Sequence, residues 1–320
     1  MKRPLIASGT FLPLILSGVT ASAEQFTLRP RIEFGLYDYS FERDGQLDVP
    51  IVARDGGQAL FSFGAIEFSD TRPFVGLGLT AAWDRFYVDL SLARSDGLEI
   101  DDRQNFSQTF LADVGGAPAP AVISSLDGRL SSDDLRVTDY SVSVGYAVSG
   151  LLSVYAGYRR GQVDTEARLD VRATDNVIGL GSVTYDSSAP LEIEFDKRGP
   201  FVGAIYGLPF EGGLLKGVLT TNLAVAFLKG DYRQWAPDAV TEDGATLPTM
   251  EFSNGGVEGD TVGLTLGFNW VGQTPLEGLS YNVGVSGYSY EFDADSGDDS
   301  VRTDFSETLF TYKLGLAYLF

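Results

Sequence analysis

The alternation of large apolar side chains with small or polar ones limits most strictly what this chain can fold into. The pattern is clearest in residues 310–320. Every second residue there is large and apolar: Phe310, Tyr312, Leu314, Leu316, Tyr318 and Phe320. Neighbouring strand residues point to opposite faces of a sheet, so this alternation predicts a strand with one apolar face. Soluble domains rarely end on such a strand, because terminal residues are usually polar and loosely held.

The same alternation recurs in pairs of segments that are joined by short turns. The clearest pair is 75–83 and 86–92, with Asp84 and Arg85 at the turn. The other pairs are 140–148 with 152–158, a pair that turns near 211–213, and 262–270 with 281–285. A first strand from Phe26 to about Tyr39 and the final strand bring the count to ten. Because residues 59–68 are also strand-like, twelve strands is the alternative.

The connections between these segments are unequal in length. Five long segments alternate with turns of only a few residues: 41–71, 96–135, 162–197, 232–257 and 292–303. Short turns on one side and long loops on the other are typical of transmembrane β-barrels. Aromatic residues at the short-turn ends predict an interfacial girdle: Trp83, Phe86, Tyr146, Trp270, Tyr281 and Phe320. We therefore predict an all-β fold, a single antiparallel transmembrane β-barrel.

The last strand also resembles the carboxy-terminal assembly signal of bacterial outer-membrane β-barrel proteins. The residues that carry the resemblance are Lys313, Gly315, Tyr318 and Phe320. It implies location in the bacterial outer membrane and recognition by the barrel-assembly machinery. It also implies contact with membrane lipid and lipopolysaccharide as partners. The resemblance indicates no subfamily.

The first residues have the features of a secretory signal peptide. Lys2 and Arg3 precede a mostly apolar stretch, 5–19, and Ala21-Ser22-Ala23 supplies small residues for cleavage. We expect residues 1–23 to be removed and residues 24–320 to form the barrel.

Composition excludes several function classes. The chain has no cysteine, which excludes disulfides and thiolate metal sites, and its net charge of −21 argues against binding nucleic acid. It also has no histidine. Outer-membrane proteases of the omptin family, lipid A deacylases and phospholipases use an active-site histidine. We therefore expect no enzymatic activity and no cofactor, with a histidine-independent hydrolase as the least favoured alternative.

The polar faces of the strands place several charged side chains in the lumen. They are Arg29, Arg31, Glu33, Asp89, Arg159, Glu307 and Lys313. A barrel of eight to ten strands is narrow enough for side chains to fill much of it, and buried charges need partners. We therefore predict that these charges pair, with Glu33 and Lys313 meeting across the seam between the first and last strands. The alternative is that they line a small pore or a ligand cleft.

The stretch 293–299 has acidic residues at spacings similar to those of a calcium-binding loop. Asp293, Asp295, Asp298 and Asp299 are the weak metal-ligand candidates. The stretch lacks the closing glutamate and the flanking helices of an EF-hand. A solvated acidic loop is the favoured interpretation, and weak divalent-cation binding is the alternative.

Two function classes remain open on this evidence. The first is a structural or binding barrel, or at most a narrow channel, with long acidic extracellular loops. The second is a porin-like diffusion channel for small solutes. Strand number separates them, because about sixteen strands leave an aqueous channel and about eight leave a filled interior. Ten strands favour the first class.

Overall fold

The computed structural model describes residues 26–44, 47–52, 58–63, 66–114, 117–177, 181–210, 216–235, 241–242, 245–246, 257–294 and 304–320. The predicted signal peptide, 1–23, lies outside these ranges. Among the described residues, no helix is long and apolar enough to cross a membrane.

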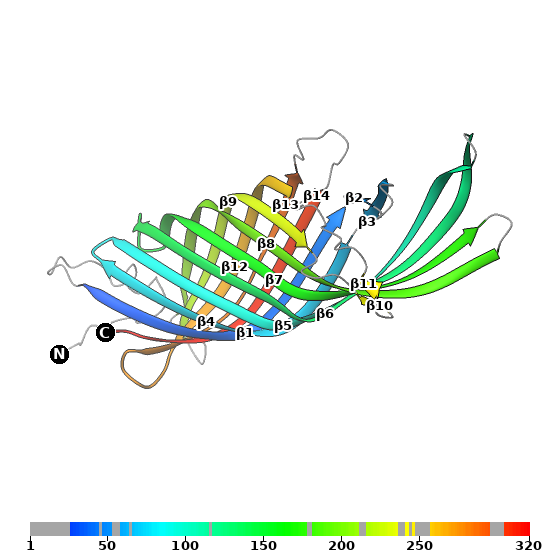
Figure 1. Cartoon of the computed structure of the whole chain (residues 1–320). Coiled ribbons are helices and arrows are strands. Elements are labelled where there is room, and N and C mark those ends of the chain that lie inside the picture. Colours follow the sequence, from blue (N-terminus) through cyan, green and yellow to red (C-terminus); the bar gives the residue numbers. More distant parts are fainter. Residues whose placement is uncertain are drawn as a thin grey trace, which may run out of the picture.

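Ten long strands form one closed antiparallel barrel (Figure 1). They are β1 (Thr27–Asp44), β4 (Ile66–Trp83), β5 (Phe86–Val114), β6 (Ala117–Ala147), β7 (Leu152–Val177), β8 (Gly181–Phe210), β9 (Gly217–Trp235), β12 (Val257–Gln273), β13 (Leu279–Ala294) and β14 (Asp304–Tyr318). The order around the barrel is β1-β14-β13-β12-β9-β8-β7-β6-β5-β4. The predicted fold class and the count of ten barrel strands are therefore confirmed.

The alternative of twelve strands is wrong for the barrel, although extra strands exist. Strands β2 (Leu47–Val52) and β3 (Gln58–Phe63) pair with each other in a separate two-stranded sheet. Strands β10 (Thr241–Glu242) and β11 (Ala245–Thr246) form another such sheet. The strand-like stretch 59–68 divides between β3 and the start of β4. The extra hairpin therefore does not widen the barrel.

The short turns lie where the sequence places them. Strands β4 and β5 are joined by Asp84 and Arg85, and Asp84 has φ 52°, a left-handed conformation that aspartate tolerates better than most residues. Strands β6 and β7 are joined between Ala147 and Leu152, and β12 and β13 between Gln273 and Leu279. The turn predicted near 211–213 lies outside the described residues.

The prediction that segments 96–135 and 162–197 are loops is wrong, because their described residues are strands. Strands β5 and β6 pair out to Val114 and Ala117, and β7 and β8 pair out to Val177 and Gly181. The β5–β6 and β7–β8 hairpins extend well beyond the rim of the barrel (Figure 1). Hairpin pairing needs only backbone hydrogen bonds, so a polar sequence without an apolar face forms it too. Apolar alternation therefore does not reveal these extensions in the sequence.

The outer surface has an apolar band that fits a bilayer. Leu90, Val144, Val154 and Leu266 face outward and are 43–54% exposed. Aromatic rings pack against one another at the short-turn edge, for example Phe86 against Tyr146 in a tilted arrangement with centroids 5.1 Å apart. At the opposite edge the outward residues become charged. Three cations occupy directly paired positions on β7, β8 and β9: Arg160, Arg198 and Lys229.

The orientation of β12 can be tested by placing a charge on each of its faces. Leu266→Arg should lower the free energy of unfolding by about 2–4 kcal/mol, as for a cation on the lipid face of a barrel. Thr265→Arg should cost less, because Thr265 lines a polar cavity inside the barrel. Urea titrations of both variants in lipid vesicles measure the difference. Equal costs on the two faces would contradict the observed register.

Candidate functional site

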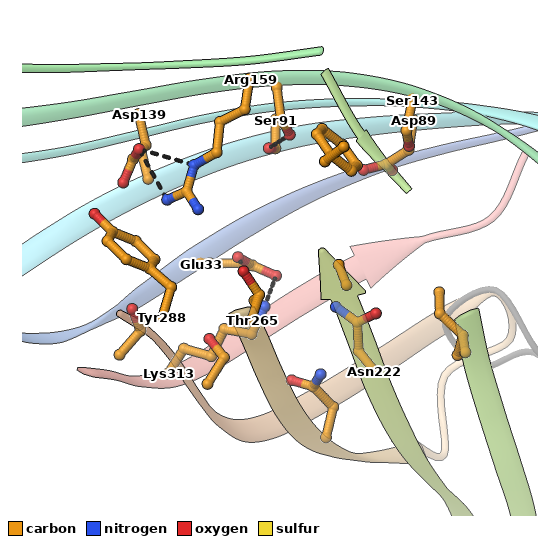
Figure 2. Close-up of a pocket in the computed structure, with 18 of the residues that line it drawn as sticks. Glu33, Asp89, Ser91, Asp139, Ser143, Arg159, Asn222, Thr265, Tyr288 and Lys313 are labelled. Atoms are coloured by element: carbon orange, nitrogen blue, oxygen red, sulfur yellow. Dashed lines mark hydrogen bonds and ion pairs between the residues drawn. The ribbon is translucent and has the colours of Figure 1, made fainter. Parts of the chain in front are cut away.

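The inside of the barrel holds a polar cavity of about 340 Å³. Inward side chains from all around the barrel line it, and Figure 2 shows ten of them labelled around a common space. Along β1, the cavity residues Arg29, Arg31 and Glu33 precede the residues of an aromatic cluster. The cavity therefore lies on the side of that cluster that carries the short turns. This cavity is the candidate functional site.

A series of connected ion pairs crosses the seam between β1 and β14, where the barrel closes. Arg31 donates two hydrogen bonds to the Asp89 carboxylate, with Nη2 3.0 Å from Oδ2. Its Nε lies 3.6 Å from Oε1 of Glu33, and Lys313 Nζ lies 3.2 Å from the same oxygen. Asn282 also donates to Glu33. The predicted pairing of Glu33 with Lys313 is therefore confirmed.

A second polar network lies next to the aromatic cluster. Arg159 donates to Asp139 from Nη2 at 2.9 Å and to the hydroxyl of Tyr290 at 2.9 Å. Lys197 pairs with Glu307, and both side chains are at most 1% exposed. Because Lys197 is on β8 and Glu307 on β14, four places away in the strand order, this ion pair spans the lumen.

Two glycines allow the cationic side chains to lie flat against the wall. A Cβ on Gly78 would be 2.3 Å from Cζ of Arg31, and a Cβ on Gly161 would be 2.2 Å from Cε of Lys197. Any larger residue would displace these side chains. The glycines thus help to place the Arg31 guanidinium and the Lys197 ammonium group.

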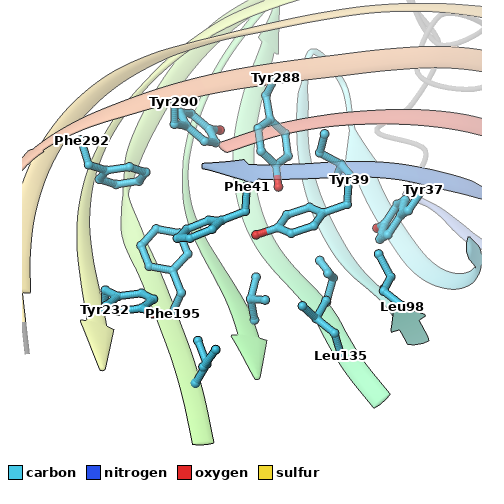
Figure 3. Close-up of a cluster of buried hydrophobic side chains, with 14 of the residues drawn as sticks. Tyr37, Tyr39, Phe41, Leu98, Leu135, Phe195, Tyr232, Tyr288, Tyr290 and Phe292 are labelled. Carbon is cyan, nitrogen blue, oxygen red and sulfur yellow. The ribbon is translucent and has the colours of Figure 1, made fainter. Parts of the chain in front are cut away.

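Large rings pack together inside the lumen beyond the cavity. We call this cluster the aromatic plug. It consists of Tyr37, Tyr39, Phe41, Phe195, Tyr232, Tyr288, Tyr290 and Phe292. Figure 3 shows these rings converging from several strands. Phe41 and Phe195 have centroids 5.7 Å apart, and Phe195 and Phe292 have centroids 5.2 Å apart. All eight side chains are 6% exposed or less.

The sequence-predicted lumenal residues fall into two groups. Arg29, Arg31, Glu33, Asp89, Arg159 and Lys313 line the cavity, whereas Glu307 lies beside the plug with Lys197. Asp139 and Lys197 were not predicted from the sequence. They form ion pairs with Arg159 and Glu307, respectively. Asp139 lies between a predicted loop and a predicted strand, and Lys197 lies at the end of a predicted loop. Inward and outward positions were not assigned in either place.

The remaining candidate residues lie elsewhere. Asp293 pairs in backbone register with Asp260 and Asp304, whereas Asp295, Asp298 and Asp299 lie outside the described residues. Cation binding there stays a prediction. Lys313, Gly315 and Tyr318 are on β14, and the Phe320 ring packs on Tyr318 with centroids 4.7 Å apart.

Breaking the Lys197–Glu307 pair should destabilise the barrel strongly. Lys197→Met leaves the Glu307 carboxylate buried without its cation, and should lower the free energy of unfolding by about 3–5 kcal/mol. The double variant with Glu307→Gln should recover much of that loss. Lys229→Met is the matched control, because its pair with Asp260 is 80% exposed on both sides and should contribute at most about 1 kcal/mol. Additive costs in a urea-unfolding cycle would contradict the buried pair.

Of the known proteins compared with this chain, OmpT supports the fold. No protein-family model and no curated protein matches the sequence. The outer-membrane protease OmpT from Escherichia coli superimposes with a TM-score of 0.54 at 10% identity, covering 94% of this chain and 100% of that chain. The toluene transporter TodX from Pseudomonas putida (TM-score 0.27, 12% identity, 91% and 90% covered) and OprG from Pseudomonas aeruginosa (0.23, 13%, 74% and 96%) are also similar. The closed ten-strand barrel with its outward apolar band, together with the likeness to OmpT, shows that the chain has the fold of a bacterial outer-membrane β-barrel.

Proposed function

We propose that this protein is a non-conducting outer-membrane β-barrel with a structural or binding role. The single observation that carries the proposal is the contact of Phe41 with Phe195 inside the lumen, at 5.7 Å between centroids. Phe41 is on β1 and Phe195 on β8, which lie five places apart in the ten-strand order. The two rings therefore meet from opposite walls of the barrel.

Other contacts across the lumen support the same proposal. Lys197 reaches from β8 to Glu307 on β14, and Arg159 reaches from β7 to Tyr290 on β13. Solutes and ions cannot pass while these rings and ion pairs stay in contact. A porin-like pore also needs more strands than ten.

The chemistry of the lumen supports a role without catalysis. The structurally similar OmpT is a protease, but a likeness at 10% identity indicates a shared fold and does not indicate a shared activity. The chain has no histidine, so the histidine-dependent hydrolase chemistry described above is not open to it. Asp89, Asp139 and Glu33 each hold a cation in an ion pair, which leaves these carboxylates poorly suited to act as a general base.

Two surfaces would bind ligands, the outer apolar band and the cavity. Membrane lipid and lipopolysaccharide would contact the apolar band and the cations at its edge, Arg160, Arg198 and Lys229. The cavity would take a small solute from the end that carries the short turns. The opposite end of the cavity is filled by the plug. Inward residues near the short-turn end include small ones (Ala82, Ser153, Ser280 and Ala317) beside the larger Tyr87, Val218 and Val271.

Conductance measurements test the proposal directly. The wild-type barrel, reconstituted in planar lipid bilayers, should show no resolved single-channel steps. The double variant Phe41→Ala/Phe195→Ala should produce discrete current steps, because it removes both rings that meet in the middle of the plug. Stable single-channel steps from the wild-type protein would overturn the closed-lumen proposal.

A matched control separates opening of the lumen from general loosening of the barrel. Phe227 and Phe268 face outward and are 50% and 41% exposed. The double variant Phe227→Ala/Phe268→Ala removes two rings of the same type from the lipid face. It should remain silent, and equal conductance in both double variants would mean that the current does not pass through the plug.

A further inference from the structure

We propose that the lumenal cavity binds a small hydrophilic carboxylate at Arg29. The inference deepens the proposed binding role and rests on it, because a lumen that is blocked by the plug can retain a solute that an open channel would pass. It begins from the charges that line the cavity. Four are cationic and three are acidic: Arg29, Arg31, Arg159 and Lys313 against Glu33, Asp89 and Asp139.

Three of these cations have acidic partners and one does not. Arg31 pairs with Asp89 and Glu33, Lys313 pairs with Glu33, and Arg159 pairs with Asp139. Among the residues that the structure describes, Arg29 makes no ion pair, and its buried Nε has no hydrogen-bond partner. The Arg29 side chain is nonetheless enclosed, since the residue is 8% exposed.

An enclosed guanidinium without an anion is costly, because the charge has lost much of its water. Arg29 also lies two residues from Arg31 on the same face of β1, so a second positive charge is close. A bound monoanion would neutralise the excess charge. The planar carboxylate group matches the guanidinium, which donates parallel hydrogen bonds to its two oxygens.

The rest of the cavity wall indicates the kind of carboxylate. Beside rings such as Phe74 and Phe201, the wall presents amide and hydroxyl groups, for example those of Asn222, Asn269 and Thr220. Oδ1 of Asn269 is buried and, within the described part of the chain, accepts no hydrogen bond. Such a wall favours a ligand that carries hydroxyl groups beside its carboxylate. A cavity of about 340 Å³ suits a molecule of sugar-acid size rather than a polymer.

Calorimetric titration of the refolded barrel in detergent micelles tests this assignment, with gluconate as the probe. Glucose is the neutral control, inorganic phosphate is the alternative anion, and chloride keeps the ionic strength constant. We expect saturable binding of gluconate, and no saturable binding of glucose. Binding of phosphate alone, or of no probe, would overturn the proposal.

Two variants assign the binding to Arg29. Arg29→Gln should weaken gluconate binding by about tenfold or more, since a charge-assisted hydrogen-bonded contact is lost. Arg85→Gln is the matched control, because Arg85 lies exposed in the β4–β5 turn at the same end of the barrel, and it should change affinity less than about twofold. Equal gluconate affinity in Arg29→Gln and the wild type would overturn the site.

A stability measurement gives an independent readout. Without any added carboxylate, Arg29→Gln should unfold at the same or a higher urea concentration than the wild type, because it removes an enclosed charge that has no bound anion. Marked destabilisation would show that Arg29 is held by a structural partner, and would overturn the proposal. A wild-type barrel that is silent in bilayers but binds no gluconate would overturn this inference and leave the closed lumen intact.

Discussion

The closure of β1 on β14 is the constraint on which the rest of the structure depends. Within a bilayer every backbone N–H and C=O must pair inside the protein, and a sheet satisfies this only when it has no free edge. The register runs from Arg31 opposite Ala317 to Asp44 opposite Asp304. The Glu33–Lys313 pair links side chains across the same seam. Closure at ten strands also fixes the diameter, and hence what the lumen can hold.

That diameter explains why the interior separates into two layers. Where inward residues are Ser, Thr, Asn and charged groups, the walls leave a cavity, and ion pairs reach only part of the way across. Where they are Tyr and Phe, the rings are long enough to meet from opposite walls, as Phe41 and Phe195 do. Lys197 and Glu307 lie at the junction of the two layers. Both charges are enclosed there, so each depends on the other for its stability.

The likeness to OmpT is a likeness of fold, and a barrel fold does not determine activity. The two chains share the fold over nearly their whole lengths at 10% identity. A barrel scaffold places many different side chains in the same inward positions, and chemistry follows from those residues. In this chain the inward residues are paired charges, amides and rings. On our proposals, they block the lumen and leave Arg29 as the one cavity cation without an acidic partner among the described residues.

The sequence by itself determined the outward face of the strands in its recognised hairpins, the place of the aromatic residues near the short turns and the count of ten barrel strands, because side chains alternate with period two along any strand. It also determined the Glu33–Lys313 pair, since the first and last strands of a closed barrel must be neighbours. It did not reveal the hairpin extensions beyond residues 96 and 162, because polar strands pair through backbone alone. Only the tertiary structure decided that Lys197 meets Glu307 and Phe41 meets Phe195. Those contacts join strands that are far apart in the order, so they depend on the barrel's diameter and stagger, which no local pattern encodes.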